Sequence, residues 1–192
     1  MRIDRKRRSP QRVAVCFTGQ IRTFERAKHA IQTQLLNNLQ KIFSNVDTIA
    51  IQNSGDEKFD GVSQWFNYTD LAIMKDYYKQ RFLHKINISV AKACYQYFSY
   101  YGFYGSLLHV LEMWRDVSRC RKTILDVEKA NGVKYDILVR WRYDYSPTAV
   151  KLELIKDWDS TIYTSEKHVG VQDSFAIGPR KFMMDYFSYP IE

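Results

Sequence analysis

Residues 135–147 read Tyr-Asp-Ile-Leu-Val-Arg-Trp-Arg-Tyr-Asp-Tyr-Ser-Pro, a stretch that begins as a β-strand and ends in a cluster of charge. Successive side chains of a strand point to opposite faces. One face then carries the apolar and aromatic residues Ile137, Val139, Trp141 and Tyr143. The other face carries Leu138 and a row of charged residues, namely Arg140, Arg142 and Asp144. This row falls near the carboxyl end of the strand, where open α/β sheets bind their ligands. A solvated strand face could carry the same charges, so both interpretations stay open.

The beginning of the chain predicts the sheet to which this strand belongs. Residues 12–17 and 46–51 are short, β-rich apolar runs typical of buried strands. Between them, apolar residues recur at helical spacing at Phe24, Ala27, Ile31, Leu35 and Leu39. A strand, a helix and a second strand in this order predict a parallel βαβ unit with a right-handed crossover.

The turn Thr18-Gly19-Gln20 falls between the first strand and this helix, where a nucleotide would bind. Glycine lets a ligand approach the backbone, and a helix N-terminus offers N–H groups to an anion. Arg22 could add a phosphate contact. A lone glycine also serves turn geometry alone, and the segment is neither a G-x-G-x-x-G fingerprint nor a Walker A loop. Ligand contact and a plain turn are therefore both open.

The rest of the chain continues the α/β pattern without repeats or linkers. The periodicity predicts helices over residues 71–82 and 91–130, the latter ending at Asn131-Gly132, short strands over residues 161–164 and 170–178, and a final helix whose first turn holds Pro179. We therefore expect one α/β domain over residues 12–192, with a mostly parallel mixed sheet flanked by helices. A basic, flexible arm over residues 1–11 precedes it.

The net charge of +8 suggests attraction to polyanions, but part of it lies in the first dozen residues, whose basic side chains are Arg2, Arg5, Lys6, Arg7, Arg8 and Arg12. The remaining basic excess is moderate. Nucleic-acid binding is thus a lesser alternative, supported by the arm and by the tyrosine-rich run over residues 95–104.

The cysteine pattern argues against a disulfide framework and against a zinc site. Cys16, Cys94 and Cys120 are widely spaced, odd in number and form no C-x-x-C pair. A reducing compartment fits this pattern. The apolar run over residues 13–17 is too short for a signal peptide core or a membrane span. The sequence therefore predicts a soluble, cytoplasmic chain without a membrane span.

Candidate chemistry concentrates at three places, which are residues 19–22, residues 140–144 and Asp173. Asp144, at the end of a central strand, could bind a divalent cation that bridges two phosphates of a nucleotide. Arg140 and Arg142 could neutralise the diphosphate charge that develops on a leaving group. Asp173 is the best available second acidic residue, as general base or further ligand. Together these residues predict a transferase that uses a nucleotide diphosphate.

Three segments carry a family resemblance. They are residues 13–24 (Val-Ala-Val-Cys-Phe-Thr-Gly-Gln-Ile-Arg-Thr-Phe), residues 134–144, and residues 171–178 (Val-Gln-Asp-Ser-Phe-Ala-Ile-Gly) followed by residues 183–187 (Met-Met-Asp-Tyr-Phe). They resemble a group of predicted glycosyltransferases, found in large DNA viruses, phages, bacteria and some algae or plants, with a Rossmann-like GT-A fold. The resemblance runs from about residue 12 to the end of the chain.

The resemblance implies transfer of a sugar from a nucleotide-diphosphate sugar to a glycan or protein-linked glycan acceptor, usually with Mn²⁺ or Mg²⁺. By this likeness the Gly19 turn holds the nucleotide, and Asp173 lies near the acceptor. Arg140, Arg142 and Asp144 occupy the place of the family's acidic metal-binding motif. The D-x-D pair common in GT-A enzymes is absent, because Arg142 stands two residues before Asp144. A binding protein that keeps the fold without turnover is therefore the alternative. The resemblance also leaves room for a further C-terminal, acceptor-binding part.

Overall fold

The computed structural model describes residues 12–19, 21–51, 63–70, 107–146, 151–155, 157–164 and 174–188. Its strands are β1 (Arg12–Thr18), β2 (Asn45–Ile51), β3 (Tyr68–Asp70), β4 (Ile137–Arg142), β5 (Tyr163–Thr164) and β6 (Phe175–Pro179). They form one six-stranded sheet in the order β3-β2-β1-β4-β6-β5. β1 pairs in parallel with β2 and β4, and β2 with β3, whereas β6 runs antiparallel to β4 and β5. The prediction of an α/β fold with a mostly parallel mixed sheet is confirmed.

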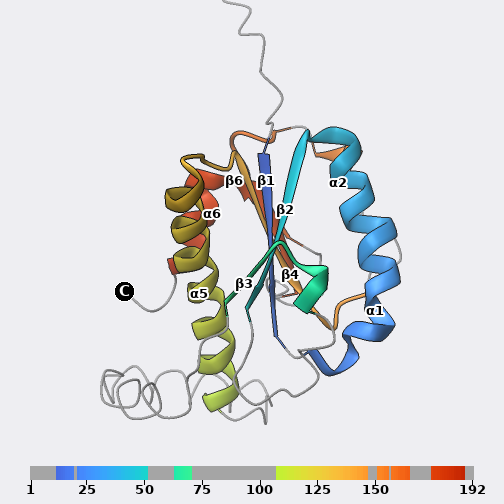
Figure 1. Ribbon diagram of the computed structural model, residues 1–192, viewed down its shortest axis with the longest axis vertical. Coiled ribbons are helices and arrows are strands. Elements are labelled where there is room, and N and C mark those ends of the chain that lie inside the picture. Colours follow the sequence, from blue (N-terminus) through green and yellow to red (C-terminus); the bar gives the residue numbers. More distant parts are fainter. Residues whose placement is uncertain are drawn as a thin grey trace, which may run out of the picture.

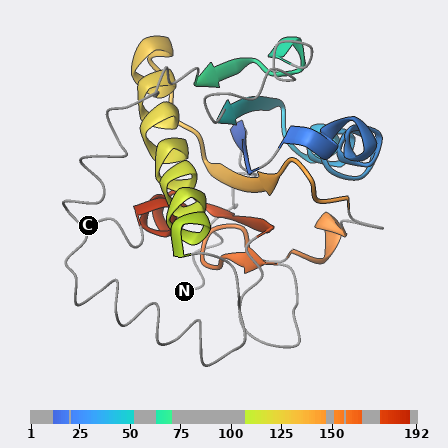
Figure 2. The ribbon, with the colours of Figure 1, turned by 90° about the horizontal axis from the view of Figure 1, so that it is seen from below.

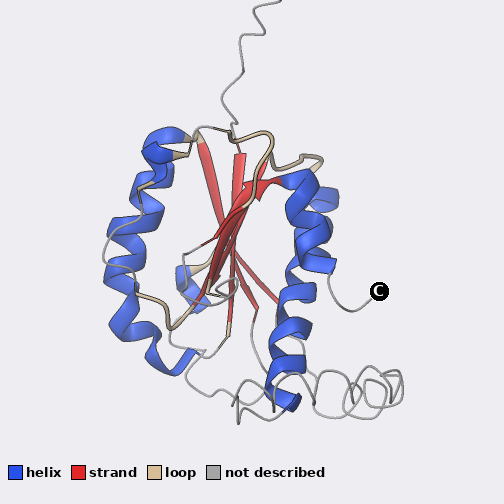
Figure 3. Cartoon of the chain, turned by 180° about the vertical axis from the view of Figure 1, so that it is seen from behind, coloured by secondary structure: helices blue, strands red, loops and turns tan. Residues whose placement is uncertain are grey.

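Helices cover both faces of this sheet (Figure 1 and Figure 3). On one face lies a continuous helical run made of α1 (Phe24–Ala30), a π-helical segment (Ile31–Leu36) and α2 (Asn37–Ile42). On the other face lie α5 (Leu107–Asn131) and α6 (Arg180–Ser188). Figure 2, which looks along the sheet from below, shows the strands between these two helical layers.

The predicted apolar stripe of the first helical run is confirmed, because all five of its residues are buried. Three of its steps are four residues long, and each such step overshoots a turn of α-helix by about 40°. A stripe of that kind drifts off one face of a regular α-helix. The wider turn of the π-helical segment over Ile31–Leu36 counters the drift and keeps the later residues against the sheet.

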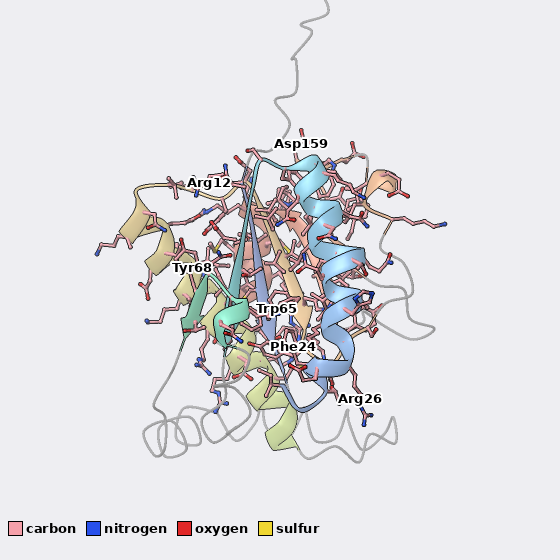
Figure 4. All side chains as sticks on the ribbon, turned by 45° about the vertical axis from the view of Figure 1, so that its right-hand side comes forward. Arg12, Phe24, Arg26, Trp65, Tyr68 and Asp159 are labelled. Atoms are coloured by element: carbon pink, nitrogen blue, oxygen red, sulfur yellow. A yellow bond between two sulfur atoms is a disulfide. The ribbon has the colours of Figure 1, made fainter. Side chains whose placement is uncertain are left out.

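The two faces of β4 separate as the alternation predicts. Ile137, Val139, Trp141 and Tyr143 belong to the core beneath α1 and α2, whereas Leu138 belongs to the core beneath α5 and α6. Aromatic rings close the first core from the side: Phe24 of α1 packs edge-on against Trp65, with ring centroids 5.4 Å apart (Figure 4). Strand β4 is thus packed on both faces along most of its length.

The later boundaries differ slightly from the sequence prediction. Gly132 follows α5 with a φ of +64°, which confirms the predicted helix stop. Pro179 is the last residue of β6, so the final helix begins one residue later than predicted, at Arg180. The short strand β3 was not predicted. The arm over residues 1–11, the helix expected over residues 71–82 and the first part of the long helix lie outside the described residues.

The prediction that the chain lacks disulfides was wrong. Cys16 of β1 and Cys120 of α5 form a disulfide, with their Cα atoms 6.0 Å apart, and both residues are fully buried. Nothing in the sequence indicated this pair, because the cysteines are 104 residues apart and only the packing of α5 across β1 brings them together. Cysteine usage therefore no longer supports a reducing compartment. In the described part of the chain, no helix has the length and apolar character that a membrane span requires.

Candidate functional site

The order of the strands places a topological switch point between β1 and β4. Strands β2 and β3, which follow β1 in the chain, lie on one side of β1, whereas β4 lies on its other side. The chain connections on the two sides therefore lead in opposite directions from this point. Crevices at the carboxyl ends of such strands are the usual ligand sites of open α/β sheets. At this edge Thr18 pairs with Arg142, and beyond the strand ends the Tyr143 N–H donates to the Thr18 carbonyl at 3.0 Å. The site is therefore built on the ends of these two strands.

Gly19 forms the turn that leaves β1 and lies against the side chain of Arg142. Its φ of +93° is a conformation that residues with a side chain rarely adopt. A Cβ at this position would lie 3.7 Å from Arg142 Cγ, which is an ordinary contact distance. Backbone conformation rather than space thus selects glycine here. Gln20 lies outside the described residues, and Arg22 is described only by its backbone, in the 3₁₀ turn Ile21–Thr23.

Arg142 and Asp144 form a bidentate ion pair at the end of β4. Arg142 Nε donates to one carboxylate oxygen at 2.9 Å, and Nη2 donates to the other at 2.7 Å. The pair forms because the chain turns after the strand, where the Tyr145 N–H donates to the Arg142 carbonyl at 3.1 Å. Both side chains stay partly exposed, at 32% and 23%. A cation at Asp144 would have to share the carboxylate with this guanidinium.

Tyr143 anchors this edge from inside. Its ring packs against Phe17, Phe24 and Phe66, and its hydroxyl donates to the Ile51 carbonyl at the end of β2, at 3.3 Å. Burial, and then the nearby charge of Asp116, raise the pKa of Tyr143 well above its ordinary value. The phenol therefore stays neutral and holds the end of β4 to the end of β2.

Arg140 does not reach the surface with the rest of the predicted row. It is 1% exposed, on the face of the sheet that α5 and α6 cover. Its Nη1 donates to the Tyr186 hydroxyl of α6 at 3.4 Å, whereas Nε and Nη2 are buried without a hydrogen-bond partner. The hydroxyl of Thr18 is likewise buried and unpartnered. Only the outer members of the row, Arg142 and Asp144, are open to solvent.

Sequence reasoning missed two charged residues of α5. Asp116 and Arg119 are 2% and 8% exposed, and they form an ion pair at 3.6 Å. Their three-residue spacing within the apolar pattern of Trp114, Val117 and Cys120 was the available signal, since it puts both charges near the buried face of a helix. The predicted Asp173 lies outside the described residues. Its neighbour Ser174 accepts a hydrogen bond from the Arg142 N–H at 3.0 Å.

The carboxyl edge thus combines a left-handed glycine turn, a partly exposed guanidinium and one carboxylate. Comparisons with protein-family models, curated proteins and solved structures yield no match. Within the described residues, no group of three or more His, Cys, Asp and Glu side chains is arranged to hold a metal ion. The chemistry that this edge offers is recognition of an anionic group by Arg142, which already holds the Asp144 carboxylate, so a further anion would compete with it.

Proposed function

We propose that this chain is a glycosyltransferase that binds a nucleotide-diphosphate sugar at the switch point between β1 and β4. One observation carries the proposal: the Gly19 turn lies against Arg142 at the switch point between the parallel strands β1 and β4. A backbone turn without a side chain lets a diphosphate approach, and the partly exposed guanidinium can donate to its oxygens in competition with Asp144. The sequence resemblance to glycosyltransferases of the GT-A type supports the assignment of the reaction.

In the proposed reaction an acceptor hydroxyl attacks the anomeric carbon of the donor sugar. A glycosidic bond forms, the bond to the diphosphate breaks, and the nucleoside diphosphate leaves with the electron pair. Arg142 would stabilise the negative charge on this leaving group. Asp173 would accept the proton of the acceptor hydroxyl. A Mn²⁺ or Mg²⁺ ion bound by Asp144 would supply further positive charge, in competition with Arg142.

The first test is a thermal-shift panel of UDP- and GDP-sugars, each with and without Mn²⁺. We expect at least one donor to raise the Tm, because a ligand that binds only the folded state stabilises it. Asp144→Ala is expected to remove the shift. If no nucleotide sugar shifts the Tm under either condition, the proposal fails.

The dependence on Mn²⁺ separates two roles of Asp144. If Asp144 binds the metal, Asp144→Asn removes only the part of the shift that requires Mn²⁺. If Asp144 instead orients Arg142, the loss is the same with and without the ion. Asp126→Asn is the matched control, since this exposed carboxylate pairs with Lys122 on the outside of α5. The control is expected to keep the full shift.

A binding protein without turnover is the second candidate, and the Arg142–Asp144 pair favours it specifically. Arg142 occupies the position of the first carboxylate of a D-x-D pair and engages both oxygens of Asp144. This candidate predicts that a donor shifts the Tm while neither sugar transfer nor donor hydrolysis accumulates product. The two functions are distinguished by measuring the release of nucleoside diphosphate by chromatography over several hours.

A further inference from the structure

We propose that Asn67 is an acceptor of N-linked glycosylation, and that the chain folds in a compartment where this modification takes place. Asn67, Tyr68 and Thr69 form an Asn-X-Ser/Thr triplet without proline in the middle, which is the acceptor sequence of this modification. Such triplets also occur by chance, so the surroundings of Asn67 decide whether this one is used. The proposal does not rest on the proposed function.

The buried disulfide is the first observation in favour of the proposal. Cys16 and Cys120 are bonded to each other and fully buried. Disulfides form and persist in oxidising places such as the lumen of the endoplasmic reticulum and the cell exterior, and they are rare in the cytosol. Glycosylated Asn-X-Ser/Thr triplets belong to secreted proteins, which pass through that lumen. The disulfide thus favours a compartment in which the triplet would be modified, in place of the cytoplasmic location predicted from the cysteine pattern.

The position of Asn67 in the fold leaves room for a glycan. The residue lies directly before β3, and it is exposed to solvent. Among the described strands β3 is the outermost one on its side of the sheet, paired only with β2 (Figure 2). A sugar chain attached at this edge would extend into solvent and would displace no core residue.

Hydrogen bonds to Thr48 determine which end of the Asn67 amide is free. The Thr48 N–H donates to Asn67 Oδ1 at 2.8 Å, and the Thr48 hydroxyl donates to the same oxygen at 2.9 Å. A backbone N–H only donates, so the amide atom that it meets must be the oxygen. No described group accepts a hydrogen bond from Nδ2, the nitrogen to which an N-linked glycan is attached. A glycan on Nδ2 would therefore leave both bonds to Thr48 intact.

These bonds explain only one part of the triplet. They require an acceptor oxygen at position 67, which an aspartate would supply as well. They require neither the Asn67 Nδ2 group nor the hydroxyl of Thr69, for which the described residues offer no hydrogen-bond partner. A β-branched residue suits strand β3 at position 69, but valine would suit it equally. Glycosylation is the role that uses both Nδ2 and the Thr69 hydroxyl.

The donor of the modification is an oligosaccharide carried on a lipid diphosphate, and the host's oligosaccharide-transferring enzyme catalyses the step. A bond forms between Asn67 Nδ2 and the anomeric carbon of the first sugar. The bond between that carbon and the diphosphate oxygen breaks, and the lipid diphosphate leaves with the electron pair. Nδ2 gives up one proton to a base of the enzyme and keeps the other.

The test expresses the full chain behind a cleavable secretion leader in eukaryotic cells. The chain recovered from the medium or the cell lysate is mapped by peptide mass spectrometry before and after treatment with peptide-N-glycosidase. We expect a glycan on Asn67, which the enzyme removes while converting the residue to aspartate. Thr69→Val should lose this glycan, whereas Thr69→Ser keeps the hydroxyl and should retain it. Asn87→Gln is the matched control, because Asn87-Ile88-Ser89 is the other Asn-X-Ser/Thr triplet of the sequence, and it should leave the glycan on Asn67 unchanged.

A second measurement asks whether the folded chain holds Nδ2 as the structure shows. The enzyme-treated wild type has the sequence of Asn67→Asp at this position, so the two proteins should have the same Tm. The glycosylated wild type should have a Tm at least as high, because all three proteins keep an acceptor oxygen for the N–H and the hydroxyl of Thr48.

Two results would overturn the proposal. The first is a chain that has passed through the secretory compartment and formed the Cys16–Cys120 bond but carries an unmodified Asn67, whether or not Asn87 bears a glycan. The second is a glycosylated wild type whose Tm lies well below that of Asn67→Asp, which would mean that the folded chain does not leave Nδ2 free.

Discussion

Breaking the disulfide between Cys16 and Cys120 is expected to lower the free energy of unfolding by about 2–5 kcal/mol. The bond joins the central strand β1 to α5, and the two cysteines are separated by 104 positions in the sequence. A loop of this length restricts the unfolded chain strongly, so its opening favours the unfolded state. In the folded state both cysteines lie in the core beneath α5 and α6.

Urea unfolding of the wild-type chain with and without reductant measures this contribution. The double variant Cys16→Ala/Cys120→Ala should unfold at lower urea concentration and should no longer respond to reductant. Cys94→Ser is the control, because it leaves the Cys16–Cys120 bond in place and should respond to reductant like the wild type. Peptide mapping under non-reducing conditions should recover residues 16 and 120 in one cross-linked fragment. Equal stability of the wild type and the double variant under oxidising conditions would contradict the expectation.

The sequence predicted those parts of the fold that depend on local periodicity. The alternation in residues 137–143 correctly separated the apolar residues Ile137, Val139, Trp141 and Tyr143 from Leu138 on the opposite face of the strand. The spacing of the residues from Phe24 to Leu39 correctly defined the buried face of the first helical run. Strand β3 was missed because its three residues are too few to show alternation. The disulfide was missed because contact between β1 and α5 is a property of the packed layers, which residue spacing does not express.

The sequence predicted the location of the candidate site better than the contacts and exposure of its side chains. The carboxyl ends of β1 and β4 do meet, as a parallel sheet requires. The alternation placed Arg140 and Arg142 on one face, but it could not show that α6 covers the first and leaves the second partly exposed. It also could not show that the turn after β4 folds Asp144 back onto Arg142. Both outcomes depend on segments distant in sequence or on the path of a turn.

A second bidentate ion pair, between Glu128 and Arg180, lies near the amino end of β4. Its removal should lower the free energy of unfolding by an amount similar to loss of the disulfide. Glu128 of α5 accepts hydrogen bonds from Arg180 Nε and Nη2 and from the Tyr135 N–H, at 3.0 Å for the last. The carboxylate is 6% exposed. Glu128→Gln keeps an oxygen for the Tyr135 N–H but leaves the guanidinium without its charge partner, and breaking such a buried pair costs about 3–5 kcal/mol. Arg180 is 26% exposed and can be partly hydrated, so we expect the lower end, about 3 kcal/mol.

The pH dependence of this effect identifies its electrostatic origin. Burial alone would raise the pKa of Glu128, but the hydrogen bonds from Arg180 and from the Tyr135 N–H outweigh it and lower the pKa. A carboxyl whose folded pKa is lowered stabilises the fold fully above its unfolded pKa, and this contribution is lost as the pH falls through the folded pKa. Urea unfolding should therefore show the full difference between the wild type and Glu128→Gln at about pH 7 and a smaller one at about pH 3. Asp126→Asn, which removes the exposed carboxylate paired with Lys122, should change the free energy of unfolding by no more than about 0.5 kcal/mol at either pH. A difference for Glu128→Gln that stays constant between the two pH values would show that shape and packing, rather than charge, hold α6 to α5 at this edge.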